Sequence, residues 1–561
     1  MIFLPPQAFL KGCRYYYYYY LTKKRFLRIM SRMSSENNAW IGGAWLGASY
    51  GLSPVMPLSV FSRIGGRRAS QRVEGIRTET YVESVRPPGN LHGHLTFHLK
   101  HETPHLELLS RLFEKIDAGE LAAWVADEPT GQYARRAGFL YEFLTGRQLN
   151  IAAEIGGAYI DVIDDRKLVA ATSGREVLNR RWHVRDNLPG TRAFCPMVRK
   201  TEAVLQSMAL DIPALLNDLL AEFGQELLMR SAVWMTLRES KSSFAIEGEA
   251  DQSDRIQRFA DVLARHTGQG PWPLDDASLA VLQSEILGQR TTLQHFGLRQ
   301  SPVFVGEIVR YQEVVHYVAP PAEDLAAMLD GLKTFLERTR GQSPVMRSAV
   351  VAFGFVYIHP LADGNGRVHR FLINDVLRRD GVVEAPMILP VSALITRDQV
   401  ERRSYDDILD AVSRPLMSSL SGLYEFAGMA ETFPDGIRSN FVFRGDDMAR
   451  PAWRMPDLSR HVGYLANLLE RTIREEMREE SRYLRNHAQA RRAIKEIIEM
   501  PDMQIDRVIR SVEVNQGRLS NALAEEIPAL QEDGIWKAIR QAVERAFQNA
   551  FDDKTGGTER R

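Results

Sequence analysis

The sequence predicts a mainly α-helical protein. From about residue 104 onward, apolar residues recur at three- and four-residue spacing over long stretches. Residues 346–358 are apolar on almost every side, which indicates a buried central helix. Residues 303–318 differ, because β-branched and aromatic residues dominate them and two prolines follow, and this pattern predicts a β-hairpin.

The composition is that of a globular protein with a real core. Of the 561 residues, 44% are hydrophobic and 25% are charged. The 71 basic residues balance 71 acidic ones, so the charge gives no reason to expect nucleic acid or an anionic membrane as a partner. The two cysteines, Cys13 and Cys195, exclude a disulfide framework and fit a cytoplasmic protein.

The N-terminal segment 1–33 is unusual. It has no acidic residue, contains a run of tyrosines, and lacks the apolar segment and cleavage site of a signal peptide. We interpret it as a dispensable or mis-annotated leader, with Met30 or Met33 as the true start. Residues 38–62 carry no charge and are long enough to cross a bilayer. Because glycines and two prolines interrupt them, we expect an extended segment packed on the body of the protein instead.

Helices are also expected at 106–116, around 139–144, and over 203–237 with a break near Pro213. A further helix is expected to begin near Val368 and to end at Gly381. Beyond residue 455 the chain is again amphipathic and helical. Two short helices, at 501–512 and 518–526, have the spacing of a helix-turn-helix, but without a basic recognition face we favour a structural module.

A zinc-protease pattern, H-E-x-x-H, occurs at His101–His105. Its chemistry requires both histidines on one face of a continuous helix. Pro104 would break such a helix, whereas Thr103 and Pro104 are typical of a helix start. We therefore predict that a new helix begins here, capped by Thr103, and that no metal site is present.

The most informative segment lies between the two central helices, at 359–370, and reads HPLADGNGRVHR. Glycines at the start of a helix let backbone N–H groups converge on an anion, and the helix dipole adds to the attraction. Arginine forks in the first turn match phosphate oxygens, a carboxylate beside them suits Mg²⁺, and a histidine before them suits a proton acceptor. These residues are Arg367, Arg370, Asp363 and His359, around the nest Gly364, Asn365 and Gly366.

This segment resembles the Fic motif, H-x-F-x-[D/E]-G-N-G-R-x-x-R, at every defined position except the phenylalanine, where Leu361 stands. The resemblance implies a protein adenylyltransferase with a helical Fic core and a β-hairpin flap. His359 would deprotonate a target hydroxyl, which attacks the α-phosphate of ATP. Asp363 would hold Mg²⁺, and the nest and both arginines would bind phosphates. Tyr405 is spaced like a tyrosine found near the adenine.

A second segment, Ser243–Gly248, resembles the inhibitory sequence [S/T]-x-x-x-E-[G/N] of one Fic class. By this resemblance, the Glu247 carboxylate pairs with Arg370 and occupies the site of the γ-phosphate. Ser243 and Gly248 are the flanking positions of the motif. In some relatives such a glutamate serves the reverse reaction, removal of AMP from modified protein, and the sequence leaves both directions open.

The resemblance also implies a partner protein that bears a hydroxyl side chain and is captured by the flap at 303–321. A homodimer is compatible with the sequence, a nucleic-acid or membrane partner is not expected, and longer Fic proteins of this kind are bacterial. Two further alternatives are transfer of a different phosphate-containing group and a regulatory or DNA-binding protein acting through its C-terminal helices. The predicted regions are a leader at 1–33, an extended and helical region at 34–215, the Fic core with its inhibitory helix at 216–430, and a C-terminal helical region at 431–561.

Overall fold

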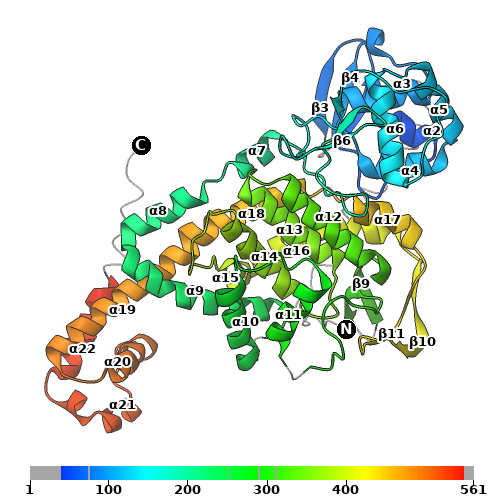
Figure 1. Cartoon of the computed structure of the whole chain (residues 1–561). Helices are drawn as coiled ribbons and strands as arrows, with labels where there is room; N and C mark the ends of the chain where they lie inside the picture. The colour runs from blue at the N-terminus through cyan, green and yellow to red at the C-terminus, as the bar shows by residue number, and fades with distance from the viewer. Residues whose placement is uncertain (1–38, 74–75, 250–251, 289–290, 310–311, 549–561) are drawn as a thin grey trace. The chain divides into compact units, whose positions relative to one another are not determined.

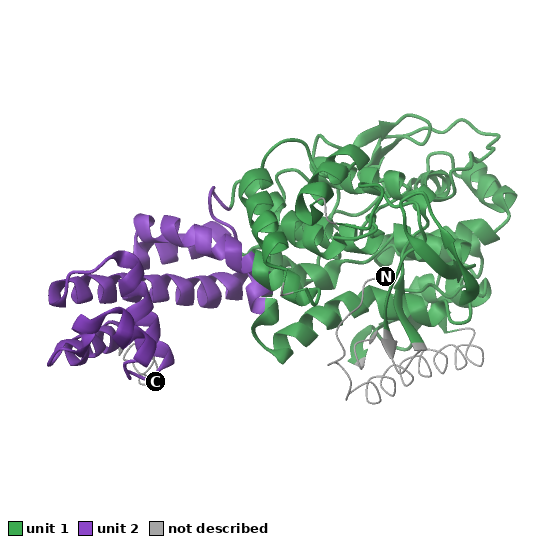
Figure 2. Cartoon of the chain, turned by 90° about the horizontal axis from the view of Figure 1, so that it is seen from below, with its two compact units in different colours: residues 1–210, 240–382, 395–467 green, residues 211–239, 383–394, 468–561 purple. Residues whose placement is uncertain are grey.

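A computed structural model describes residues 39–73, 76–249, 252–288, 291–309 and 312–548 (Figure 1). The leader 1–33, with Cys13, lies outside the described residues. Within them the chain is mainly α-helical, as predicted. It divides into two compact units, each assembled from three separate segments (Figure 2). The first unit contains 1–210, 240–382 and 395–467, and the second contains 211–239, 383–394 and 468–561.

The N-terminal part of the first unit has a core of its own, built mainly from four helices, and two small sheets lie in the same part of the chain. One sheet has the strand order β1-β2-β4-β3, in which β2 and β4 are parallel, and the other has the order β5-β7-β6. The elements are β1 (Trp40–Ile41), α2 (Gly43–Ser49), β2 (Val60–Ile64), β3 (Ala69–Val73), β4 (Ile76–Tyr81), α3 (Leu91–His101), α4 (Leu106–Lys115), α5 (Ala118–Asp127), α6 (Gln132–Thr145), β5 (Ile160–Asp161), β6 (Val177–Asn179), β7 (Val184–Asp186) and α7 (Glu202–Met208).

The uncharged stretch 38–62 is packed on this core, but it is not simply extended. It contains the helix α2, in which Ala44 and Leu46 are buried. The carboxylate of Glu102 accepts a hydrogen bond from the backbone N–H of Gly43, in the first turn of that helix. A buried carboxylate at a helix N-terminus stabilises the helix, and the sequence pattern of α2 alone did not reveal this partner.

The zinc-protease pattern does not form one helix. His101 is the last residue of α3, and α4 begins only at Leu106. The cap of α4 is His105, whose Nδ1 accepts from the backbone N–H of Leu108, so the predicted cap at Thr103 was wrong. The described residues contain no cluster of three or more His, Cys, Asp or Glu side chains able to hold a metal ion.

The rest of the first unit surrounds the apolar helix α13 (Pro344–Ile358) (Figure 1). All but two of its residues are buried, as the sequence predicted, and its closest neighbour is α14 (Asn365–Arg379), which ends just before Gly381. The other helices of this part are α10 (Ser253–His266), α11 (Asp276–Leu287), α12 (Leu325–Arg338), α16 (Gln399–Ser419), α17 (Asp446–Arg454) and α18 (Ser459–Arg471). The last residues of α18 belong to the second unit.

Two antiparallel hairpins belong to this part of the first unit. The predicted hairpin is formed by β8 (Phe304–Val309) and β9 (Gln312–Val318). The sequence did not indicate the other, formed by β10 (Tyr424–Thr432) and β11 (Arg438–Phe443). Phe304 of β8 packs against Phe426 and Phe441 of the second hairpin, so the two hairpins share an aromatic contact.

Helices and the segments that connect them make up the described part of the second unit, which contains no strand there. The predicted helix over 203–237 has a second break, because Gly224 adopts a positive φ of 80° between α8 and α9. The C-terminal helices enclose a separate apolar core. The elements are α8 (Ile212–Phe223), α9 (Gln225–Ile246), α15 (Val391–Arg397), a π-helical segment (Thr472–Met477), α19 (Arg478–Ile497), α20 (Asp502–Val514), α21 (Asn521–Glu526) and α22 (Ile535–Gln548). Two of these helices continue into the first unit, α9 after Glu239 and α15 after Leu394.

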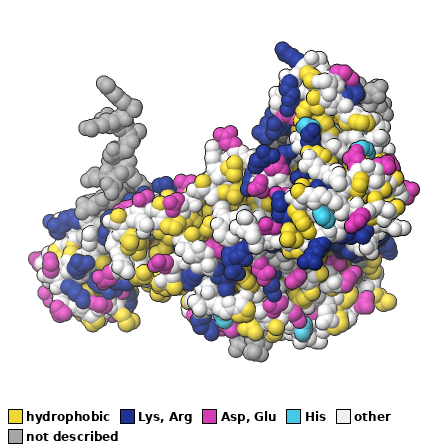
Figure 3. All heavy atoms as spheres, turned by 45° about the horizontal axis from the view of Figure 1, so that its top comes forward, with side chains coloured by type: hydrophobic (Ala, Val, Ile, Leu, Met, Phe, Trp, Pro, Cys, Tyr) yellow, Lys and Arg dark blue, Asp and Glu magenta, His cyan; other side chains and the backbone are white. Residues whose placement is uncertain are grey.

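Both short helices of the expected helix-turn-helix are present as α20 and α21. Several basic side chains near them pair with acidic ones: Arg491 with Asp506, Lys495 with Asp502, and Arg507 with Glu526. Basic and acidic side chains are interspersed on the visible face of this unit (Figure 3). On this face the distribution gives no concentrated basic surface for a nucleic-acid backbone.

No single described helix is long and apolar enough to cross a membrane. The adjacent helices α7 and α8 satisfy the length and composition test only when taken together.

The packing of α6 against Trp182 provides a test of the N-terminal core. A methyl group at Gly138 would collide with the Trp182 ring, so we expect Gly138→Ala to destabilise the protein by about 1–3 kcal/mol. The measurement is the midpoint of thermal unfolding. The matched control is Gly428→Ala, because a methyl group there meets no atom within 4 Å. Equal midpoints for the two variants would contradict this packing.

Candidate active site

The predicted site residues come together where α13 ends and α14 begins. His359 is the C-cap of α13 and Gly364 is the N-cap of α14. Both residues have a left-handed backbone, with φ of 50° and 93° respectively. The turn between them is therefore short, and the second helix starts at Asn365, three residues before the predicted start. The glycine at 364 tolerates its conformation freely, whereas the histidine bears a cost of roughly 1–2 kcal/mol.

The side chain of Asn365 closes this turn. Its Oδ1 accepts from the backbone N–H of Leu361 at 3.0 Å, and its Nδ2 donates to the carbonyl of Leu361 at 2.7 Å. Leu361, which stands at the one defined position that departs from the Fic motif, is fully buried. The amide of Asn365 is thus occupied by the turn, which leaves its backbone N–H for an anion.

The backbone N–H groups in the first turn of α14 have no partner within the helix and carry the positive end of its dipole. A Cβ placed on Gly364 would meet no atom within 4 Å, so there is open space beside the nest. Arg367 and Arg370 follow in the first two turns and are almost completely buried. The arrangement can bind an anion with several phosphate oxygens.

His359 is oriented as a proton acceptor. Its Nδ1 lies 3.2 Å from the carbonyl of Val356, so a proton on Nδ1 leaves the lone pair of Nε2 free. Nε2 is buried and has no hydrogen-bond partner among the residues that the structure describes. Burial lowers the pKa of His359 to about 4, and the nearby charge of Arg299 acts in the same direction. The ring is therefore neutral at pH 7 and able to take a proton.

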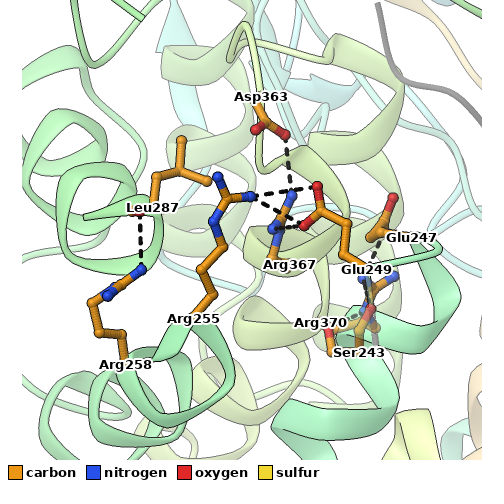
Figure 4. Close-up of polar contacts among 9 residues, drawn as sticks. All are labelled: Ser243, Glu247, Glu249, Arg255, Arg258, Leu287, Asp363, Arg367 and Arg370. Atoms are coloured by element: carbon orange, nitrogen blue, oxygen red, sulfur yellow. Dashed lines mark hydrogen bonds and ion pairs between the residues drawn. The ribbon is translucent and has the colours of Figure 1, made fainter. Parts of the chain in front are cut away.

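The C-terminal end of α9 lies against the arginines of α14 (Figure 4). Arg370 donates from Nε to Ser243 Oγ at 2.7 Å and from Nη2 to the Ser243 carbonyl at 3.1 Å. The same Nη2 pairs with Glu247 Oε1 at 2.7 Å, which confirms the predicted contact. Gly248, with φ of 76°, turns the chain immediately after Glu247.

Glu247 is held as an anion in this position. Burial by itself would raise the pKa of Glu247, but Arg370 and Arg367 outweigh that effect and lower it. A Cβ on Gly366 would collide with the Glu247 carboxylate, so the glycine of the nest also makes room for it. The carboxylate therefore stands at the N-terminus of α14, where an anionic ligand would otherwise lie.

A second carboxylate, that of Glu249, was not predicted from the sequence. It pairs with Arg367 at 2.9 Å and lies 3.4 Å from Arg255 of α10 (Figure 4). Arg367 also donates to Asp363 at 3.1 Å and lies over the ring of Phe244. The repeated acidic residue in Glu247-Gly248-Glu249 was the signal available in the sequence, but it gave no indication of which arginine each carboxylate contacts.

Asp363 is the residue with the chemistry to hold a metal ion at the nest. Its carboxylate is 32% exposed, and Gln283 of α11 donates to its backbone carbonyl, which fixes the turn. Mg²⁺ is commonly held by one or two carboxylates together with phosphate oxygens and water. A single accessible carboxylate beside a phosphate-binding nest fits that pattern.

Tyr405 of α16 is close to the site but enclosed. Its ring lies between those of His369 and Tyr464, and burial raises the pKa of its hydroxyl, while Arg370 opposes the rise. The prediction that Tyr405 lies on the adenine side remains a prediction.

Comparison with known proteins shows which family the region around this turn resembles. Residues 273–377 match the model of the Fic/DOC family, a range that includes the β8–β9 hairpin, α13 and most of α14. The chain is 34% identical over 112 residues to protein adenylyltransferase fic-1 from Caenorhabditis briggsae. It is 32% identical over 111 residues to protein adenylyltransferase Fic from Drosophila ananassae. These matches cover about a fifth of this chain and span about a fifth of each relative's length.

Among solved structures, a Fic family protein from Desulfovibrio desulfuricans matches 63% of this chain and 90% of its own, with 20% identity and a TM-score of 0.34.

The environment of His359 predicts its titration. Because its pKa is lowered to about 4, the ring stays neutral as the pH falls through 6.5 and gains a proton only near pH 4. We expect its ¹³Cε1 NMR signal in histidine-labelled protein to be constant between pH 5.5 and 8. The His359→Ala variant identifies the signal by its loss. A midpoint between pH 6 and 7 would disprove this assignment of its environment.

Proposed function

We propose that this chain, which carries a domain of the Fic/DOC family, transfers AMP from ATP to a hydroxyl side chain of a target protein. The observation that carries the proposal is the position of His359. A neutral, buried imidazole with a free Nε2 stands one short turn before a helix N-terminus with two buried arginines. This combination supports proton removal next to a bound polyphosphate.

In the proposed reaction, Nε2 of His359 takes the proton of the target hydroxyl. The hydroxyl oxygen forms a bond with the α-phosphorus of ATP, and the bond to the bridging oxygen of pyrophosphate breaks. The backbone N–H groups of Gly364, Asn365 and Gly366 and the guanidinium of Arg367 would hold phosphate oxygens and stabilise the developing charge. Asp363 would hold Mg²⁺, which supplies neutralisation of the phosphate charge when bound.

The β8–β9 hairpin supports the proposed choice of substrate. It is a two-stranded ribbon with no further strand described beside it, so its edges can accept an extended segment of a target as an added strand. Backbone pairing of this kind places one side chain of the segment with little demand on its sequence. A Ser, Thr or Tyr hydroxyl presented there is the proposed acceptor.

The carboxylate of Glu247 supports autoinhibition. It occupies Arg370 with a charge-assisted hydrogen bond and stands at the nest through the space that Gly366 leaves. ATP must displace it or bind with misplaced phosphates. We infer that the resting enzyme is held at low activity by Glu247, and that Glu249 adds to this by occupying Arg367.

Loss of the Glu247 carboxylate should activate the enzyme. We expect Glu247→Gly to raise the rate of ³²P transfer from α-labelled ATP to protein by roughly 10- to 100-fold, since hydrogen bonds to charged groups contribute about 1.5–3 kcal/mol. Ala245→Gly is the matched control, because it introduces a glycine at an exposed position of the same helix end and leaves the ion pair intact. Glu247→Gly with His359→Ala should abolish labelling.

Equal labelling by wild type and Glu247→Gly would contradict the inhibitory role. If neither labels protein, the reverse reaction becomes the better account, and release of AMP from modified protein by wild type but not by Glu247→Gly would establish it.

Removal of the Glu249 charge should improve nucleotide binding. In the Glu247→Gly background, we expect Glu249→Gln to lower the Kd for ATP by about two- to fivefold, because this pair is one-third exposed on the glutamate side and partly screened. Isothermal titration measures the Kd. Glu285→Gln is the control, because Glu285 is similarly exposed and pairs with Arg265 instead. Weaker ATP binding in Glu249→Gln would show that Glu249 organises the site rather than blocking it.

A further inference from the structure

Arg299 is a buried arginine that binds backbone carbonyl groups. It lies in the segment that leads into β8 and is 1% exposed. Its Nε donates to the carbonyl of His359 at 2.8 Å, its Nη1 to Ser301 at 2.8 Å, and its Nη2 to Pro320 at 2.5 Å. Burial lowers the pKa of Arg299 to about 10, so the group still carries its charge at neutral pH. Burying a charge is costly, and such a group is normally retained for the contacts it makes.

The three carbonyl groups belong to the parts of the site that must meet in the reaction. The hydrogen bond from Arg299 to the carbonyl of His359 holds the left-handed backbone of the residue that carries the proposed base. Ser301 comes just before β8 and Pro320 comes just after β9, so both ends of the hairpin are held by the same guanidinium. A planar fork with several N–H donors can make these contacts simultaneously, whereas an ammonium group offers a single point charge.

The backbone beside Arg299 strengthens this connection. The N–H of Arg299 donates to the carbonyl of Pro360 at 2.9 Å, and Leu298 forms an antiparallel bridge with Leu361. The carboxylate of Asp435, in the turn between β10 and β11, accepts from the N–H groups of Gln300 and Ser301 and from the Ser301 hydroxyl. Segment 298–301 is therefore held on one side by the histidine turn and on the other by the second hairpin.

We propose that Arg299 is a positioning residue that sets the place of His359 relative to the base of the β8–β9 hairpin. This inference rests on the proposed function, in which the hairpin presents the target hydroxyl to His359. The distance from Nε2 to that hydroxyl then depends on how the hairpin base is tied to the histidine turn. None of the Arg299 contacts described here involves Arg367, Arg370 or the nest, so ATP binding does not depend on it directly.

The charge of Arg299 has a second, separable effect. It opposes protonation of His359, while Glu247 on the other side favours it, and burial dominates both. Removal of the Arg299 charge therefore raises the pKa of His359. In the pH profile of the transfer rate, the fall in rate at low pH then begins at a higher pH. Arg299→Lys retains the charge and loses the three-way contact, whereas Arg299→Gln loses both.

The test uses the full chain with Glu247→Gly, alone and combined with Arg299→Lys, Arg299→Gln or Arg347→Lys. Arg347 is the matched control, a buried arginine of α13 that binds Asp380 and two oxygens away from the site. We expect Arg299→Lys to lower kcat by roughly 10- to 100-fold with the Kd for ATP unchanged, since small misplacements of reacting groups have effects of this size. Arg299→Gln should also shift the acid limb upward, and Arg347→Lys should change neither quantity.

A second readout does not require transfer activity. In the otherwise wild-type chain, hydrogen exchange measured by mass spectrometry should be faster in Arg299→Lys at the described residues of 303–319 and at 359–362, and unchanged there in Arg347→Lys. If Glu247→Gly fails to transfer AMP, the proposed function fails while faster exchange still supports the positioning role. The positioning role is overturned if Arg299→Lys exchanges hydrogen at the wild-type rate in these segments, or if its kcat is unchanged in an active Glu247→Gly background. If Arg299→Gln does not fold, Arg299→Lys alone decides between these outcomes.

Discussion

The site depends on the turn between α13 and α14, in which two left-handed residues are separated by only four others. A backbone of this shape is not stable by itself, because a histidine with positive φ costs about 1–2 kcal/mol. It persists because its surroundings fix it: Asn365 bridges the turn from within, and Leu361 is buried beneath it. The apolar helix α13 supplies the rigid support, so the position of His359 follows from packing in the core.

The charges around this turn balance one another. Arg255, Arg367 and Arg370 face Glu247, Glu249 and Asp363 (Figure 4). Three buried or half-buried arginines at a helix N-terminus would otherwise attract any anion strongly, and the two glutamates satisfy them in the absence of one. A triphosphate with its metal ion brings its own negative charge, so it competes for the same guanidinium groups. In the proposed function, autoinhibition and ATP binding are therefore alternative uses of the same guanidinium donors.

Much of the candidate site could be predicted from the sequence, because the residues that form the nest are contiguous. Six of the predicted residues lie within 359–367, where helix ends and glycines determine the geometry locally. The Glu247–Arg370 pair joins residues far apart in the chain, and only the resemblance to a known motif made it predictable. The contacts of Glu249 and Arg299 carry no such pattern, since their partners are set by tertiary packing. The cap at His105 was missed for the same reason, because a local preference for Thr103 was overridden by the fold.

The Arg299 contacts and the glutamate contacts involve different residues of the turn, and this separation bears on the proposed autoinhibition. Arg299 holds the carbonyl of His359 and the hairpin, whereas Glu247 and Glu249 hold the arginines of α14. Apart from the electrostatic effect of Glu247 on the imidazole, no described contact links the glutamates to the Arg299 network. Displacement of the glutamates therefore requires no rearrangement of the proposed base. Because Gly248 alone separates them, a small movement of the end of α9 would release both carboxylates together and leave His359 already in place.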